Sequence, residues 1–331
     1  MLVAVFGFAC GKFSQMPTEF PTPELPPRAT PAAKLELKPD VELEKQIAKI
    51  AEAAKGKVGV AAVVLETGES ASLNADQHFP MQSVYKLPIA MAVMEKVRLG
   101  ELDLDEQIGV SKEDMVREGQ ASPLRDKNPN GGEFTIRELI RLSLKESDGT
   151  ASDVLMRVVG GGGEVQSYLD QIGVRDMKVL NTEKEIGRDW QMQYENWSTP
   201  IAATDVLRYL CAASSGPASQ FNCLEVMPID NLSVFQDVMK GLLFDMSRSN
   251  PGPKRLKGLL PAGTIVAHKT GTGGTQNGIT AATNDIGIIY LSNGKHIAIA
   301  IFVSDSPANE ETREAVIAKI AKACWDKWEK K

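Results

Sequence analysis

The sequence predicts an α/β fold in which an antiparallel sheet, flanked by helices, carries an all-helical insertion. Strand-like segments occur near both ends of the chain, and the long stretch between them has mostly helical signals. Strands from both chain ends can pair in one sheet while the intervening segment folds as a separate layer. We therefore expect an α/β domain formed by residues 40–80 and 230–331, interrupted by an all-α domain of residues 81–229.

The α/β part is expected to begin with a helix that Asp40 caps, running to about Lys55 and stopped by Gly56. A β-rich run, a Thr-Gly-Glu turn and a second run then predict a hairpin over residues 57–74. After Pro261 the pattern returns to strands, and the Asn-Gly pair in residues 292–295 is typical of a hairpin turn. A last helix is expected over about 309–328.

The insertion has two clear helix starts. Thr135 and Glu138 form a capping-box pattern ahead of an amphipathic run. Thr199 is followed by Pro200, and proline is favoured at the first helical position. These signals, and the lack of strand patterns from residue 83 to about 230, favour helices throughout this stretch.

The bulk composition excludes several classes of protein. The 331 residues are 43% hydrophobic and 24% charged, as in an ordinary globular protein. A net charge of −6 without a lysine- or arginine-rich run argues against nucleic-acid binding. The three histidines are scattered without the spacing of metal ligands, so we expect no metal and no cofactor.

The first 39 residues differ from the rest and read as a signal-like segment followed by a tether. Residues 2–9 are apolar and end in a small residue directly before Cys10, whereas residues 17–39 contain seven prolines. A proline-rich segment of this kind is extended rather than folded. The pattern predicts a periplasmic or secreted protein, with lipidation of Cys10 and plain secretion as the two open alternatives.

The other cysteines fall into two groups. Cys211 and Cys223 are close enough in sequence to form a disulfide, although the spacing does not require one. Cys324 follows Val316, Ile317 and Ile320 at helical spacing, which favours a buried core thiol.

A serine and a lysine three residues apart open the apolar run FPMQSVYKLPIAMAVMEK. On a helix, Ser83 and Lys86 would share a face, with the amine near the hydroxyl. A serine hydroxyl becomes a good nucleophile only when a neighbouring base accepts its proton. The pattern therefore suggests a nucleophile and its activator, although a cap serine followed by a solvated lysine would read the same way.

Two further motifs follow in order: Ser147-Asp148-Gly149, and Lys269-Thr270-Gly271 at the end of a predicted strand. Together with Ser83-x-x-Lys86, they resemble the penicillin-recognising serine enzymes, and most closely the class A β-lactamases. The resemblance covers about residues 41–328. It implies a serine hydrolase that opens β-lactam rings through an acyl-serine intermediate.

The resemblance also implies roles for the other motif residues. Lys269 would be a fixed positive charge beside Ser147, whose hydroxyl relays a proton to the β-lactam nitrogen. Thr270 and Thr272 would bind the substrate carboxylate, while the backbone N–H groups of Ser83 and Thr272 would form the oxyanion hole. Gly271 would leave the strand edge open to a ligand. Arg255 matches an arginine that some members use to bind the same carboxylate.

A loop glutamate decides between a hydrolase and a slow acyl acceptor. In the segment LNTEKEIGRDW, Glu183 best matches the deacylating glutamate, and Glu185 is the alternative. Such a carboxylate can orient a water for attack on the acyl-serine. The segment QMQYENW that follows resembles the extended-spectrum subgroup of class A, which also shares FPMQSVYK.

Several positions depart from the family pattern, and three of them concern the second motif and the loop. Gly149 replaces an asparagine that contacts the substrate side chain, and Gly187 replaces the asparagine that helps to hold the hydrolytic water. Asn181 replaces the arginine that often fixes the loop. The loop is therefore expected to follow the alternative course of relatives that also lack the arginine.

The leading hypothesis is a monomeric β-lactamase that acts on penicillins and cephalosporins and confers antibiotic resistance. A D-alanyl-D-alanine peptidase and a β-lactam sensor domain share the serine and lysine motifs but lack the loop glutamate. A serine glutaminase would share Ser83-x-x-Lys86 but would not explain Lys269-Thr270-Gly271. Glu183 and its loop therefore discriminate among the hypotheses.

Overall fold

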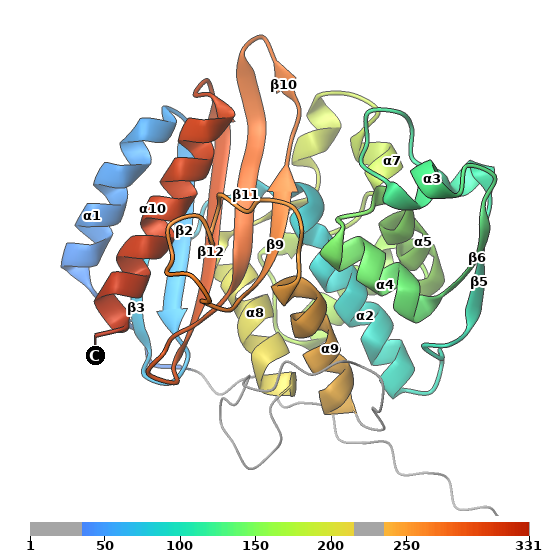
Figure 1. Cartoon of the computed structure of the whole chain (residues 1–331), viewed down its shortest axis with the longest axis horizontal. Helices are drawn as coiled ribbons and strands as arrows, with labels where there is room; N and C mark the ends of the chain where they lie inside the picture. The colour runs from blue at the N-terminus through green and yellow to red at the C-terminus, as the bar shows by residue number, and fades with distance from the viewer. Residues whose placement is uncertain (1–34, 215–234, 331) are drawn as a thin grey trace, which may run out of the picture.

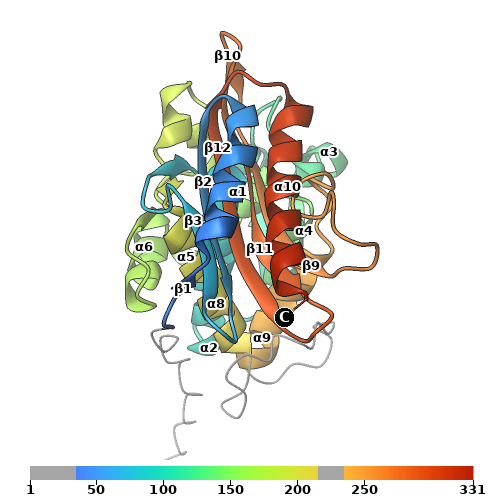
Figure 2. The same ribbon diagram turned by 90° about the vertical axis from the view of Figure 1, so that its left-hand side faces the viewer.

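The computed structural model describes residues 35–214 and 235–330. Its elements form three layers: two helices, a twisted sheet, and a helical block on the other face of the sheet (Figures 1 and 2). In the described residues, no helix has the length and apolar character needed to cross a membrane. Residues 1–34, including Cys10 and most of the expected tether, lie outside the described residues.

The main sheet joins strands from both ends of the chain, as predicted. Its order is β1-β3-β2-β12-β11-β10, and β9 also pairs with β11. All pairs are antiparallel except the short parallel pair of β1 and β3, so the sheet is mixed at this edge. The strands are β1 (Lys38–Pro39), β2 (Lys57–Val64), β3 (Glu69–Leu73), β9 (Val266–Thr272), β10 (Thr275–Gln276), β11 (Ile279–Tyr290) and β12 (His296–Ser306).

Both faces of the sheet are buried, which explains the nearly continuous apolar strands. Along β12, the isoleucines Ile297, Ile299 and Ile301 point toward α1 (Val41–Ala51) and α10 (Glu310–Trp328), which cover the outer face. The alternate residues Ala298 and Ala300 face the helical block. Small alanines allow α8 (Pro200–Ser214) to lie against this inner face.

The remaining elements form the helical block. Its helices are α2 (Lys86–Arg98), α3 (Pro123–Lys127), α4 (Ile136–Lys145), α5 (Gly149–Val159), α6 (Gly162–Gln171), α7 (Glu183–Ile186), α8 and α9 (Phe235–Ser247). Helix α2 is buried on every side, from Lys86 to Glu95, and forms the centre of the block. Helix α9 contacts α2, α4 and α8, so the helical layer continues beyond residue 229.

Short strands also occur just before and within the stretch that was expected to be all-helical, and all but β4 lie inside residues 81–229. They are β4 (Phe79–Pro80), β5 (Gln107–Val110), β6 (Gly132–Thr135), β7 (Met177–Lys178) and β8 (Trp197–Ser198). β5 pairs with β6, while β8 joins β4 and β7. Each has only two to four residues, too few to show the alternating pattern on which strand prediction depends.

Several local predictions are confirmed. Asp40 caps α1 by accepting from Leu43 N, and Thr135 forms the capping box of α4 with Glu138. The turn between β11 and β12 contains Gly294 at a left-handed φ of +81°.

The expected stop of the first helix at Gly56 is wrong. Helix α1 ends at Ala51, a 3₁₀ turn follows over Glu52–Ala54, and Lys55 takes the left-handed conformation with φ +52°. Gly56 instead lies against β12, where an added Cβ would be 2.5 Å from the carbonyl oxygen of Ser304.

Two cysteine predictions have different outcomes. Cys324 is fully buried in α10, as expected, and burial raises the pKa of its thiol to about 12. Cys211 is buried and disulfide-bonded, but the predicted partner Cys223 lies outside the described residues.

Candidate active site

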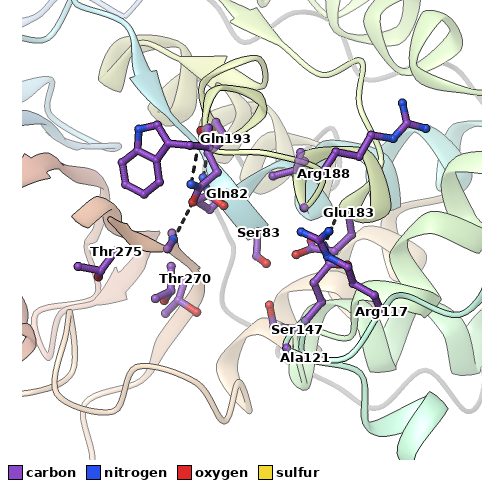
Figure 3. Close-up of a pocket in the computed structure, with 18 of the residues that line it drawn as sticks. Gln82, Ser83, Arg117, Ala121, Ser147, Glu183, Arg188, Gln193, Thr270 and Thr275 are labelled. Atoms are coloured by element: carbon purple, nitrogen blue, oxygen red, sulfur yellow. Dashed lines mark hydrogen bonds between the residues drawn. The ribbon is translucent and has the colours of Figure 1, made fainter. Parts of the chain in front are cut away.

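A cavity of about 760 Å³ opens between the edge of the sheet and the helical block. It brings together residues that are distant in sequence: Ser83, Ser147, Glu183, Thr270 and Thr272 all line it. Ser83 and Ser147 point into the space between Glu183 and Thr270 (Figure 3). The structure therefore gathers the three predicted motifs and the loop glutamate at one site.

Ser83 is the one residue between Phe79 and Glu95 that is not fully buried. It lies in a 3₁₀ turn, Gln82–Tyr85, and the α-helix begins only at Lys86. This differs from the expected α-helical placement, but residues three apart are also stacked in a 3₁₀ turn. The fold thus leaves one hydroxyl accessible within a segment that is otherwise core.

The backbone before Ser83 is fixed by its neighbours on the sheet. Asn284 Nδ2 donates to the carbonyl oxygen of Pro80 at 2.7 Å, and Gln82 has a left-handed φ of +49°. A Cβ on Gly271 would overlap the carbonyl oxygen of Met81. Gly271 therefore serves close packing of β9 against this turn, and it does not line the cavity as the sequence interpretation supposed.

Lys86 is held by two partners inside the helical block. Its ammonium Nζ donates to the carbonyl oxygen of Ser147 at 2.8 Å and lies 3.3 Å from Glu183 Oε2. Only 1% of the side chain is exposed. A buried charge needs such partners, so Lys86, Ser147 and Glu183 constrain one another.

Lys269 reaches Ser147 from the sheet side. Its Nζ donates to Ser147 Oγ at 2.8 Å and to the carbonyl oxygen of Thr270 at 3.0 Å. Complete burial, followed by repulsion from Lys86, holds the pKa of Lys269 well below its usual value. An amine with a lowered pKa can give up a proton more readily, which suits the predicted relay through Ser147.

Glu183 lines the cavity, and Glu185 does not. Glu183 Oε2 accepts a hydrogen bond from the Tyr85 hydroxyl at 2.7 Å in addition to the Lys86 ion pair. Glu185 Oε2 turns away and accepts from the backbone N–H and hydroxyl of Thr182, forming the capping box of α7. The structure therefore favours the first of the two sequence alternatives.

The charge state of Glu183 reflects opposing effects. Burial raises the pKa of this carboxyl, but the positive charge of Lys86 and the hydrogen bond from Tyr85 oppose it. The net result is a pKa below the usual value for glutamate. Glu183 is therefore ionised at neutral pH and can accept a proton.

Two residues that the sequence analysis did not identify hold this loop. Asp153 Oδ1 accepts from Glu183 N at 2.6 Å, and Oδ2 accepts from Lys184 N at 3.0 Å. Asn196 Oδ1 accepts from the backbone N–H groups of Leu180 and Asn181, both at 3.0 Å. A signal for Asp153 did exist, because it is an acid on a helix with an otherwise apolar face.

The carboxyl group of Asp153 also has an unusual pKa. Burial raises its pKa to about 7, although the two backbone N–H bonds oppose this effect. The loop backbone is thus held by the carboxylate of Asp153, whose burial makes its charged form unfavourable.

Arg255 does not itself line the cavity, and its role in binding a carboxylate stays a prediction. It is 3% exposed, and its guanidinium lies behind β9 rather than on the cavity wall. Nη2 donates to Thr272 Oγ1 at 2.9 Å, and Nε pairs with Glu314 at 3.1 Å. Arg255 can therefore act on a ligand through Thr272.

Gly149 lies beside the loop glutamate. A Cβ at this position would be 2.9 Å from Glu183 Cγ and 3.2 Å from Val116 Cγ1. Any larger residue would have to displace one of these side chains, so the departure at Gly149 fits the position of Glu183.

Comparisons with known proteins agree with this geometry. Residues 42–328 match the model of the Beta-lactamase enzyme family. The chain is 35% identical over 289 residues to beta-lactamase VEB-1 of Pseudomonas aeruginosa, covering 86% of this chain and 89% of that protein. It is also 35% identical over 286 residues to the extended-spectrum beta-lactamase PER-1 of the same organism, covering 86% of each.

Solved structures give the same result. The crystal structure of TLA-3 extended-spectrum beta-lactamase superposes with a TM-score of 0.78 at 40% identity, covering 87% of this chain and 99% of that one. A beta-lactamase from Chitinophaga pinensis has the same TM-score at 38% identity, covering 86% and 99%. The chain therefore belongs to the Beta-lactamase enzyme family, as a class A serine β-lactamase.

Proposed function

We propose that Ser83 opens β-lactam rings by forming an acyl-enzyme that Glu183 then helps to hydrolyse. The observation that carries this proposal is that Ser83 and Glu183 line one cavity while Lys86, one turn after Ser83, pairs with Glu183. This arrangement supports a nucleophile, a neighbouring lysine and a carboxylate that act together.

In the acylation step, Ser83 Oγ attacks the lactam carbonyl carbon and the lactam C–N bond breaks. The serine proton passes through a water to the Glu183 carboxylate, beside which Lys86 lies at 3.3 Å. The departing nitrogen takes a proton from Ser147 Oγ, which regains one from Lys269. The backbone N–H groups of Ser83 and Thr272 stabilise the oxyanion.

In the deacylation step, a water attacks the ester carbonyl of the acyl-serine. Before this step Glu183 releases to solvent the proton that it took from Ser83, and Lys269 takes one up from solvent, so both groups regain their starting charge. Glu183 then accepts a proton from the attacking water as the new C–O bond forms. The ester C–O bond to Ser83 breaks, and the serine oxygen regains its proton. The product is the ring-opened carboxylic acid, and the enzyme returns to its starting state.

The substrate carboxylate would bind at the sheet side of the cavity. Thr270 and Thr272 line this side, and Lys269 supplies the positive charge behind them. Arg255 supports the contact through the hydroxyl of Thr272. Penicillins and cephalosporins share this carboxylate, so both classes are proposed substrates.

The ionised Glu183 also favours a hydrolase over a D-alanyl-D-alanine peptidase or a sensor domain. Those alternatives acylate but lack a carboxylate that activates water at this position. Mixing the purified protein with a chromogenic cephalosporin tests the distinction. Many turnovers per enzyme support hydrolysis, whereas a burst of one equivalent contradicts it.

A matched serine pair tests the nucleophile. Ser83→Ala should abolish the covalent adduct with penicillin in intact-mass spectra, whereas Ser111→Ala, in an exposed capping box, should not. An adduct that persists on the Ser83→Ala protein would rule out Ser83.

We also propose that the enzyme acts in the periplasm or outside the cell, on the basis of residues 2–9 and Cys10 in the sequence. If Cys10 carries a lipid, the protein expressed in its host should partition into detergent, and Cys10→Ser should release it. If the unmutated protein stays in the aqueous phase, Cys10 carries no lipid, and plain secretion is the remaining alternative.

A further inference from the structure

Gln120 occupies a particular place on the cavity wall. Its Nε2 donates to the backbone carbonyl oxygen of Glu183, and its side chain lines the cavity. Its Oε1 is buried and has no hydrogen-bond partner among the residues that the structure describes. The bond to Glu183 is thus the polar contact that fixes this carboxamide.

The backbone that carries Gln120 is itself well held. Arg125 Nη1 donates to the carbonyl oxygens of Gln120 at 3.0 Å and of Arg117 at 2.7 Å. The neighbouring Ala121 accepts from Gly149 N at 2.9 Å. Gln120 therefore reaches the loop from a rigid base, as a supporting contact requires.

Gly187 provides the space into which Gln120 extends. A Cβ at Gly187 would be 2.5 Å from Gln120 Nε2 and 2.8 Å from its Cδ. The backbone does not demand glycine here, because φ is −74° and ψ is −5°, a conformation open to any residue. The absence of a side chain at 187 is therefore explained by packing against Gln120.

Gln120 and Asp153 hold opposite sides of the same peptide segment. Asp153 accepts from the N–H groups of Glu183 and Lys184, whereas Gln120 donates to the Glu183 carbonyl. The backbone of the proposed water-activating residue is thus fixed through both its donor and its acceptor.

We propose that Gln120 is a positioning residue for Glu183 and does the supporting work that a side chain at position 187 cannot do here. This inference rests on the proposed function, since it assigns to Gln120 a role in deacylation. Gln120 acts through the backbone of Glu183 and need not touch the reacting atoms.

The test measures acylation and deacylation separately with a penicillin, by stopped-flow mixing and intact-mass quenching. Gln120→Ala and Gln120→Met, which keeps the length but cannot donate, should each slow deacylation about 3- to 10-fold, as expected for one neutral hydrogen bond. Acylation should change less than about 2-fold. Gln191→Ala is the control, because Gln191 is an exposed glutamine of the same loop and lies outside the cavity.

A double-mutant cycle provides the sharper result. Gly187→Ala should displace Gln120 and reproduce the deacylation defect, but it should add little in the Gln120→Ala background. Additive effects, or normal deacylation in both Gln120 variants, would overturn the proposal.

Hydrogen exchange of the 182–190 segment gives a readout that does not need turnover. Relative to the unmutated protein, the rate of amide hydrogen exchange in this segment should rise in Gln120→Ala and Gln120→Met and stay unchanged in Gln191→Ala. Unchanged exchange in all three would also overturn the proposal. If the parent forms no acyl adduct, the proposed function fails, and hydrogen exchange still decides the role of Gln120.

Discussion

The two sides of the cavity are held by different kinds of contact. We call Ser83, Ser147, Thr270 and Thr272 the motif wall, and the loop of residues 180–193 the loop wall. On the motif wall, Lys86 and Lys269 both hydrogen-bond to Ser147, so the three motifs secure one another. On the loop wall, Lys86 pairs with the Glu183 side chain, but the loop backbone is fixed by Asp153, Asn196 and Gln120, which belong to none of the three motifs.

This difference shows where a family pattern can vary. Glu183 is held by Tyr85, Gln120 and Asp153, which lie 98, 63 and 30 residues away in sequence. The loop's own residues at 181 and 187 can therefore depart from the family pattern while other elements take over their support. On the motif wall, by contrast, one residue, Ser147, is the shared partner of Lys86 and Lys269.

Removing the loop carboxylate should have the largest effect. Glu183→Gln keeps the size of the side chain but cannot accept the proton of the attacking water. General-base catalysis is worth typically about 10²- to 10⁴-fold, so steady-state penicillin turnover should fall by that order. Normal turnover of this variant would mean that the loop wall takes no part in the chemistry.

Arg255→Ala should lower kcat/KM for penicillin about 10- to 100-fold. Losing a hydrogen bond from a charged donor costs roughly 1.5–3 kcal/mol, and here the loss is transmitted through Thr272.

Glu314→Gln is the matched control for Arg255→Ala. It breaks the Arg255 ion pair and should lower the melting temperature, but it leaves the contact of Arg255 with Thr272. Equal kinetic losses in both variants would show that Arg255 acts only through stability.

Asp153→Ala should slow deacylation about 10-fold and lower stability. The change leaves the N–H groups of Glu183 and Lys184 without their acceptor, at about 1–3 kcal/mol for each group. Asp153→Asn keeps one acceptor oxygen and should show a smaller loss. Stopped-flow kinetics and thermal melts of the two variants check these expectations. An Asp153→Ala protein with the deacylation rate and melting temperature of the parent would contradict the support that we assign to Asp153.

Tyr85→Phe should give the smallest effect, a shift in the pH profile. The tyrosine hydroxyl stabilises the charged form of Glu183, so its loss should raise the pKa of this carboxyl. Activity needs the ionised form and is lost as the pH falls through this pKa. The acid limb of kcat/KM should therefore move to higher pH, and a limb that stays in place would exclude Glu183 as the titrating group.

The motif wall could be predicted from the sequence because each motif is short and contiguous. Ser83 lies in a turn before a buried helix, and Lys269 lies in the middle of β9 rather than at the end of a strand, but both segments have recognisable local patterns. The sheet was predictable for a similar reason, since strands such as β12 are long and continuously apolar.

The loop wall could be predicted only in part. Glu183 was identified from its spacing within the family pattern, but Asp153 and Gln120 contact it through backbone groups. Any residue offers a backbone N–H and carbonyl, so such contacts leave no sequence signature. Arg255 was identified as a carboxylate ligand, and its burial behind Thr272 depends on the packing of β9, which sequence patterns do not reveal.

Intact-mass spectrometry of two matched glutamate variants tests the central claim most directly. Glu183→Gln and Glu185→Gln are each mixed with penicillin and followed over time, beside the unmutated protein. If the carboxylate of the loop wall is Glu183, a lasting acyl adduct accumulates only on the Glu183→Gln protein, while Glu185→Gln turns over like the parent. An adduct trapped only on Glu185→Gln, or on neither variant while both turn over normally, would contradict the account.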